Sequence, residues 1–301
     1  MKNIKDQENL NQKKVLLRLD LNVPLKKGII TDETRIDKIL PVIKFLLKKK
    51  SKIIIISHIG RPKGKVNKKL SLKPICENLE KKINQKIKLI NSNIFKLKKE
   101  DLFKNSEDQI IFLENIRFYD EEEKNDINFS KHLASLADLF VNDAFSCSHR
   151  AHASICKITE FLPSFAGLQL ETEINALKKI TTEIKKPVTC IIGGSKISTK
   201  INVITNLLKK VNNIVIVGAM ANNFFVHKNL KVGKSLIEKN TEEIIANIYK
   251  KAKVHNCKIF IPEDCMVGTD FEGTGENKNL NEIKENEIIL DIGFNTIKKI
   301  Q

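Results

Sequence analysis

Apolar and polar positions along the chain follow two different periods, and the two periods predict strands and helices in turn. Short apolar runs, such as the KIIIIS run at 52–57, predict buried strands. Apolar residues spaced three and four apart, as between 34 and 50, predict amphipathic helices. We predict strands at 14–23, 52–57, 87–90, 109–113, 139–142, 187–192, 213–217 and 258–261, and helices at 34–50, 72–83, 128–137, 170–184, 199–210, 218–225 and 241–254.

The alternation of strands with helices is typical of βαβ units around parallel sheets, and the length of 301 residues favours two domains. We therefore expect an α/β fold with two doubly wound parallel-sheet (Rossmann-like) lobes joined by a long helix. The expected lobes are 1–167 and 187–301, and the expected bridging helix is 168–186. Ligands of such open sheets bind beyond the carboxyl ends of the strands.

The composition, with 41% hydrophobic and 30% charged residues, indicates a soluble globular protein and excludes disordered and fibrous classes. No apolar run approaches the roughly 20 residues of a membrane-spanning helix, and the opening residues carry no secretory signal. The six cysteines form no C-x-x-C pair, so their spacing predicts neither a zinc site nor a disulfide framework. We expect a cytoplasmic protein without membrane contact.

The formal net charge is +17, a balance that is also found in nucleic-acid-binding proteins. However, 48 of the 53 positive residues are lysines scattered along the chain, which indicates a solvated surface, so we expect no nucleic-acid partner. The five arginines are Arg18, Arg35, Arg61, Arg117 and Arg150, all in the first half. Because the guanidinium fork grips carboxylate and phosphate in two places, we expect the first half to bind an anionic ligand.

The first candidate site lies where predicted strands end. Asp20 and Asn22 follow the first strand, and His58 follows the second. Together with the arginines, these side chains would suit a small phosphorylated acid. Taken singly, each has a structural alternative: Asp20 would cap a helix, His58 would be a structural histidine, and Arg117 would pair with the acidic run 121–123, which we interpret as solvated.

The second candidate site is the GGSKISTK turn at 193–200, between a predicted strand and a helix. Its glycines would let the backbone approach a phosphate, while the helix N-terminus and the lysines would add N–H donors and positive charge. The turn is neither a P-loop nor a dinucleotide fingerprint, and a packing role is the alternative. His149 and His152 lack the spacing and partners of a zinc site, so we expect no metal bound by the protein alone.

Taken together, these strings resemble the motifs of phosphoglycerate kinases in order and spacing, from about residue 10 to the end. The matching strings are RLDLNVP, TDETRIDKILP, SHIGRPKG, LENIRFYDEEEKND, VNDAFSCSHRAHAS, IIGGSKISTKI and VGAMANNF. The resemblance implies reversible phosphoryl transfer between 1,3-bisphosphoglycerate and ADP, giving 3-phosphoglycerate and ATP, with Mg²⁺ as the nucleotide's metal. It also implies a cytoplasmic glycolytic enzyme. No feature of the sequence indicates an oligomer, so we expect a monomer.

Carried over position by position, the resemblance implies a triose-phosphate site in the first lobe and a nucleotide site in the second. The implied triose-phosphate residues are Asp20, Leu21, Asn22, Arg35, His58, Ile59, Gly60, Arg61, Arg117 and Arg150. The implied nucleotide residues are Gly194, Ser195, Lys196, Lys200 and Gly218. Arg35 and Lys200 match the residues that stabilise the transferring phosphoryl group.

The sequence departs from the family near its end. Phosphoglycerate kinases continue into an N-G-P-x-G segment and a G-G-G-[DE]-[ST] loop that holds the nucleotide phosphates, and neither string occurs in these 301 residues. We therefore expect an incomplete nucleotide-binding lobe, in a partial sequence or a naturally short form. A non-catalytic fragment that binds 3-phosphoglycerate is the alternative function, and a nucleic-acid-binding module ranks third.

Overall fold

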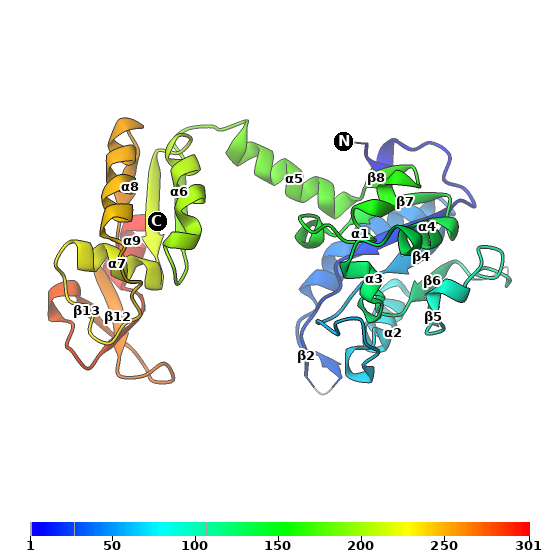
Figure 1. Cartoon of the computed structure of the whole chain (residues 1–301), viewed down its shortest axis with the longest axis horizontal. Coiled ribbons are helices and arrows are strands. Elements are labelled where there is room, and N and C mark those ends of the chain that lie inside the picture. The colour runs from blue at the N-terminus through cyan, green and yellow to red at the C-terminus, as the bar shows by residue number, and fades with distance from the viewer. Residues whose placement is uncertain (1, 27, 106–107) are drawn as a thin grey trace. The chain divides into compact units, whose positions relative to one another are not determined.

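The computed structural model describes residues 2–26, 28–105 and 108–301, and the chain divides into two compact units, Met1–Leu177 and Lys178–Gln301 (Figure 1). Each unit has its own hydrophobic core. Among the described residues, no helix combines the length and the apolar character that crossing a membrane requires.

The first unit is built on a six-stranded parallel sheet. In spatial order, its strands are β5 (Lys88–Ile90), β6 (Ile110–Leu113), β4 (Lys52–Ile56), β1 (Lys14–Leu19), β7 (Leu139–Asp143) and β8 (Ser164–Ala166). β1 and β4 are apolar almost throughout because helices cover both faces of a parallel sheet. A two-stranded hairpin of β2 (Leu25–Lys26) and β3 (Ile29–Ile30) follows β1.

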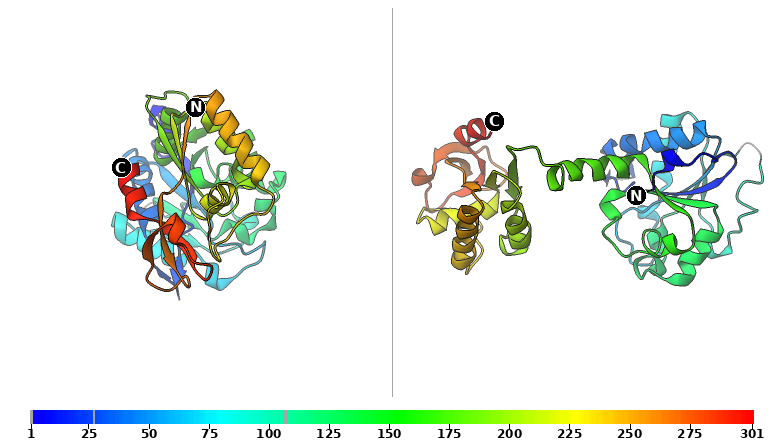
Figure 2. Two further views of the ribbon diagram at one scale, coloured as in Figure 1. Left: turned by 90° about the vertical axis from the view of Figure 1, so that its left-hand side faces the viewer. Right: turned by 90° about the horizontal axis from the view of Figure 1, so that it is seen from above.

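Alternate residues of each strand point to opposite faces of this sheet. Leu17 belongs to the same core cluster as residues of α1 (Thr34–Lys48) and α2 (Lys73–Ile83). Its neighbour Leu16 belongs to the cluster that includes residues of α4 (Ile127–Ser135). The sheet therefore lies between two helical layers (Figure 2).

The chain reverses its direction of sheet growth at β1. β4 pairs with one edge of β1, and β7 later pairs with the other edge. Such a reversal opens a crevice at the carboxyl ends of the strands, where open α/β sheets bind ligands. The residues that follow β1, β4 and β7 are therefore brought to one edge of the sheet.

The second unit contains two three-stranded sheets. The parallel sheet has the order β11 (Lys258–Phe260), β10 (Asn213–Val217) and β9 (Thr189–Gly193), and the antiparallel sheet has the order β13 (Glu276–Asn279), β12 (Asp264–Gly268) and β14 (Ile288–Ile292). The helices are α6 (Ile201–Leu208), α7 (Ala219–His227), α8 (Glu242–Val254) and α9 (Phe294–Ile300). The antiparallel sheet was not predicted from the sequence, because β13 is the polar string ENKN.

The helix predicted at 170–184 is α5 (Leu168–Thr181), and a buried aspartate stands at its start. Asp143, at the end of β7, accepts a hydrogen bond from the backbone N–H of Leu170 at 2.8 Å. In the second unit, Asp264 accepts bonds from the backbone N–H groups of Asn295 and Thr296, at the start of α9. Burial of the carboxyl group raises the pKa of Asp143 to about 6. Burial alone would also raise the pKa of Asp264, but its bonds to the Thr296 hydroxyl and the two N–H groups outweigh burial and lower that pKa.

The two aspartates should therefore respond oppositely to pH. The pKa of Asp143 is about 6 in the fold, whereas its ordinary value is 3.8. The protonated carboxyl therefore stabilises the fold at low pH, and this contribution to the free energy of unfolding is lost as the pH rises from about 4 to 6. The difference corresponds to about 3 kcal/mol. In urea unfolding, we expect the free energy of unfolding of Asp143→Asn to rise relative to that of the native chain as the pH increases through this window.

Asp264→Asn is the matched comparison, since its native carboxylate has a lowered pKa and its stabilising effect is lost as the pH falls. The native chain should therefore lose its advantage over Asp264→Asn in acid. Parallel pH profiles for the native chain and Asp143→Asn would contradict the assignment of a raised pKa.

Candidate functional site

A buried guanidinium lies near the carboxyl end of β1 in the first unit. The side chain of Arg18, in β1, is fully buried. Its Nε donates to the hydroxyl of Ser154 at 3.0 Å, one terminal nitrogen donates to the carbonyl of Leu19, and the other lies 3.0 Å from Nδ1 of His58. Every branch of the fork is thus in contact with an acceptor.

A buried carboxylate lies beyond Ser154. Glu122, in the short helix α3 (Asp120–Glu123), is fully buried and accepts hydrogen bonds from the backbone N–H of Ser154 at 2.9 Å and from its hydroxyl at 2.6 Å. Burial raises the pKa of Glu122, and the charge of Arg18 opposes this. The interpretation of 121–123 as a solvated run is therefore wrong for Glu122, because the α3 turn directs its middle carboxylate into the core.

His58 follows β4 and is only 3% exposed. Burial holds the pKa of its imidazole far below the usual range, and the positive charges of Arg18, Arg117 and Arg150 act in the same direction. The ring is therefore neutral at physiological pH. His152 is affected in the same way: burial and the charge of Arg117 lower its pKa to about 4.

Arg117 is a buried cation with unmet hydrogen-bonding capacity. It is 2% exposed, and one terminal nitrogen donates to the carbonyl of Gly60 at 3.0 Å. Its Nε lies 3.4 Å from a carboxylate oxygen of Glu123, the ion pair that the structural alternative anticipated. Within the described residues, however, neither Nε nor the other terminal nitrogen has a hydrogen-bond partner. Buried donors are nearly always satisfied, so this guanidinium is suited to receive an anion.

The remaining contacts join the strand ends. Asp20 accepts hydrogen bonds from Arg35 and from the hydroxyl of Ser146. The side-chain oxygen of Asn22 accepts from the backbone N–H of Gly60 at 2.9 Å. These bonds tie the segment after β1 to α1, to the segment after β7 and to the turn after β4.

The structure places the ten residues expected for the triose phosphate on the following segments: Asp20, Leu21 and Asn22 after β1, Arg35 in the first turn of α1, His58, Ile59, Gly60 and Arg61 after β4, Arg117 in the 3-10 turn after β6, and Arg150 after β7. Leu21 and Ile59 are buried, and Arg61 is exposed. The charge of Arg150 acts on both His58 and Arg117, which places it in the same cluster.

Sequence reasoning missed several residues of this cluster. Arg18 was assigned no contact, and Ser154, Glu122 and Cys147 were not connected with the site. The signal for Arg18 was its place as an arginine among apolar residues in a strand that is otherwise buried. No single-sequence signal connects Glu122 with it, because the two side chains are linked only through Ser154, from three separate segments of the chain.

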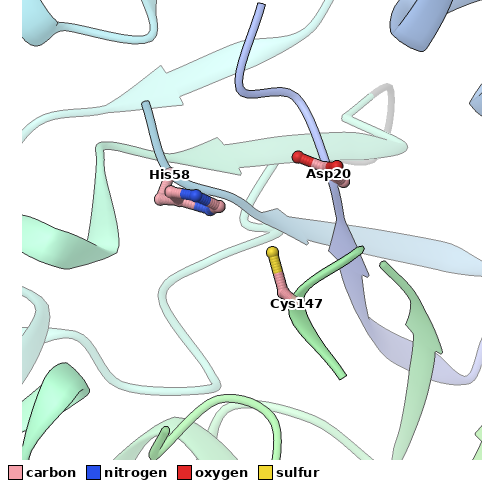
Figure 3. A group of neighbouring side chains, drawn as sticks. All are labelled: Asp20, His58 and Cys147. Atoms are coloured by element: carbon pink, nitrogen blue, oxygen red, sulfur yellow. The ribbon is translucent and has the colours of Figure 1, made fainter. Parts of the chain in front are cut away.

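Asp20, His58 and Cys147 converge from three segments, with ligand atoms within 4.8 Å of one another (Figure 3). Thiolate, imidazole and carboxylate are the ligands that Zn²⁺ prefers. However, the Nδ1 of His58 faces the Arg18 guanidinium, and Asp20 is paired with Arg35. The surrounding cations favour an anion at this place, so the three side chains do not form a good metal site.

In the second unit, the GGSKISTK turn brings two glycines together. Gly194 follows β9 and Gly218 follows β10, and a Cβ on Gly218 would lie 3.3 Å from the backbone nitrogen of Gly194. Gly218 has a φ of +67°, which L side chains rarely adopt, and Gly194 accepts a bond from the N–H of Met220 at 2.7 Å. The backbone therefore requires a glycine at position 218.

Three exposed residues of this turn are Ser195, Lys196 and Lys200. The Lys200 side chain passes beside Gly194, since its Cε lies 3.9 Å from where a Cβ of that glycine would be. A small cavity of about 30 Å³ lies beside Gly218, lined largely by apolar residues of α7, β12 and β14. Backbone, ammonium groups and an apolar cavity are thus gathered on one unit.

Comparisons with known proteins agree with this architecture. The family model described as phosphoglycerate kinase matches residues 4–301. The chain is 48% identical over 301 residues to the phosphoglycerate kinase of Wolbachia pipientis wMel, an alignment that covers 99% of this chain and 75% of that protein. It is 42% identical over 303 residues to that of Borreliella afzelii (strain PKo), covering 100% of this chain and 77% of the relative.

Two solved structures are similar over nearly the whole chain. The phosphoglycerate kinase of Coxiella burnetii has a TM-score of 0.84 at 36% identity, covering 99% of this chain and 75% of that one. That of Pyrococcus horikoshii OT3 has a TM-score of 0.82 at 26% identity, covering 99% and 77%. These similarities confirm the predicted α/β fold with Rossmann-like lobes.

Fold and site together define an α/β protein with a cluster of cationic side chains at the carboxyl ends of the strands of one unit and a glycine-lined turn on the other. The family model and the relatives make the family specific. The chain belongs to the phosphoglycerate kinase family of phosphotransferases, and the resemblance found in its sequence motifs is confirmed.

Because Gly218 lies close to Gly194, replacing Gly218 by alanine should cost more stability than its positive φ alone would cause. Gly28 has a φ of +80°, but no described atom lies within 4 Å of its Cβ position, so Gly28→Ala measures the backbone cost alone, about 1–2 kcal/mol. Gly218→Ala should lower the free energy of unfolding of its own unit by more than this, measured by urea unfolding. Equal costs at the two positions would show that the glycine contact is not tight.

Proposed function

We propose that this chain transfers a phosphoryl group reversibly between 1,3-bisphosphoglycerate and ADP, giving 3-phosphoglycerate and ATP. Membership of the family supports the reaction. The structural observation that carries the substrate assignment is Arg117, a buried guanidinium with two nitrogens that have no hydrogen-bond partner among the described residues. A carboxylate or phosphate oxygen would satisfy both nitrogens and compensate the buried charge.

In this proposal, the first unit holds the triose phosphate. Arg117, Arg150 and Arg61 bind its anionic groups, and His58 with the neighbouring backbone of Leu21, Ile59 and Gly60 shapes the pocket. Asp20 and Asn22 lie where they would accept hydrogen bonds from a hydroxyl group of the substrate.

Arg35 has a separate role in the proposal. It is in the first turn of α1, its side chain is 46% exposed, and it is held by Asp20. An exposed guanidinium with a single anchor can turn toward a phosphoryl group as it transfers. Phosphoryl transfer depends on in-line positioning and neutralisation of charge, which such a residue supplies.

The second unit holds the nucleotide. The backbone at Gly194, Ser195 and Gly218 approaches its phosphates, and Lys196 and Lys200 supply positive charge, with Lys200 as the catalytic lysine. These residues offer N–H, hydroxyl and ammonium groups and no carboxylate. The assigned protein residues therefore do not form a Mg²⁺ site, and the metal would enter bound to the nucleotide phosphates as part of the substrate. No observation favours a non-catalytic fragment over the kinase.

A cytoplasmic location, a monomeric state and the absence of a nucleic-acid partner stay predictions. They rest on the sequence alone.

Arg117→Met should weaken the binding of 3-phosphoglycerate. Removing a charged hydrogen-bond donor from a buried site costs about 1.5–3 kcal/mol, so the Kd should rise about tenfold to a hundredfold in titration calorimetry. Lys157→Met is the control, because it removes one positive charge from an exposed ion pair with Glu160. Equal Kd values for native chain, variant and control would contradict the assignment of the site.

Turnover tests the second unit. The purified chain should form ADP from Mg-ATP in the presence of 3-phosphoglycerate, and Lys200→Ala should remove most of this activity because the phosphoryl group loses a compensating charge. Lys209→Ala, at an exposed lysine just after α6, is the control. Activity that survives in Lys200→Ala would exclude its catalytic role, and a native chain that binds 3-phosphoglycerate without turnover would support the fragment instead.

A further inference from the structure

The contact between Arg18 and His58 constrains where the imidazole carries its proton. A guanidinium has only N–H donors and keeps its charge at any physiological pH. With the Arg18 nitrogen 3.0 Å from Nδ1, that ring atom is the acceptor. A neutral imidazole carries one proton, which must then be on Nε2.

We infer that Arg18 is a positioning residue that holds His58 in the Nε2–H tautomer, so that the site presents a hydrogen-bond donor to the anionic oxygen of its ligand. The inference rests on the proposed function, because it concerns how the triose-phosphate site selects an anion. In the opposite tautomer, Nε2 would present a lone pair and would repel a carboxylate or phosphate oxygen.

The orientation of Arg18 is itself fixed by its other contacts. Ser154 has one hydroxyl proton, which it donates to Glu122 at 2.6 Å. Its oxygen therefore faces Arg18 with lone pairs and accepts from Nε at 3.0 Å. The carbonyl of Leu19 accepts from the third branch. Rotation of the fork away from His58 would break both bonds inside a fully buried environment.

Glu122 fixes the orientation of the Ser154 hydroxyl, and its negative charge balances that of Arg18. Its two oxygens bind the N–H and the hydroxyl of Ser154, so the hydroxyl proton cannot point at Arg18 without leaving a buried carboxylate oxygen unsatisfied. In the order Glu122, Ser154, Arg18, His58, Ser154 therefore donates to Glu122, and Arg18 donates both to Ser154 and to His58. The same order disfavours a metal ion at Nε2, because that nitrogen has no free lone pair.

The first test needs no substitution. ¹⁵N NMR of the native chain, with imidazole nitrogens labelled, should show a pyrrole-type Nε2 and a pyridine-type Nδ1 for His58, with and without 3-phosphoglycerate. A pyrrole-type Nδ1 would overturn the inference, and it would leave the proposed function intact if 3-phosphoglycerate still binds. Failure of the native chain to bind 3-phosphoglycerate would overturn the proposed function, while the ring signals would still decide the tautomer.

The second test separates positioning from folding. Arg18→Met alone would leave Glu122 as an uncompensated buried charge, so the informative variant is the double substitution Arg18→Met with Glu122→Gln. Glu122→Gln alone is the matched control, because it keeps the Arg18 donor. Relative to this control, the double variant should show mixed His58 tautomers and a Kd for 3-phosphoglycerate raised about tenfold or more, with the Kd for ATP unchanged.

Two results of the second test would overturn the inference. One is a double variant with the Nε2–H tautomer and the control's affinity for 3-phosphoglycerate. The other is a parallel loss of affinity for ATP and 3-phosphoglycerate, which would indicate general destabilisation of the chain. If the double variant does not fold, the ring signals of the native chain alone decide.

Discussion

The complete burial of the Arg18 guanidinium is the constraint on which the first unit depends. This group cannot lose its proton, so every branch of its fork needs an acceptor inside the core. Its partners are Leu19, Ser154 and His58, and the charge of Glu122 lies behind them. These residues come from four separate segments of the chain. Satisfying one buried cation therefore holds together the strand ends that form the crevice.

In the proposed function, the two units would bind an anion in different ways. In the first unit, cations such as Arg117 are buried and already oriented before a ligand arrives, which makes their interaction strong because little reorganisation remains. In the second unit, Lys196 and Lys200 are exposed, and the backbone of two glycines provides the fixed surface. The proposed ligand groups thus belong to the packed core in one unit and to a surface turn in the other.

Periodicity predicted the parallel sheets except the edge strand β8, because buried strands and amphipathic helices leave direct patterns in the sequence. The scarcity of arginine pointed to the anion site for a similar reason, since a chain rich in lysine keeps the fork where geometry demands it. Glu122 escaped prediction because its neighbours are also acidic, and only a tertiary contact reveals which carboxylate is buried. The sheet of β12, β13 and β14 escaped because β13 is polar and a bulge interrupts the register of β12 with β14.

The distance between Arg18 and Ser154 along the chain has a consequence for biosynthesis. The two residues are separated by 136 positions, and the pairing of β1 is also incomplete until β7 has been made. At a translation rate of about 5–20 residues per second, the first strand emerges from the ribosome on the order of ten seconds before β7 and the segment around Ser154. During that interval, the nascent chain carries an apolar strand with an unmatched charge near its carboxyl end. We expect this charge to disfavour burial of the strand until the segment around Ser154 has been made.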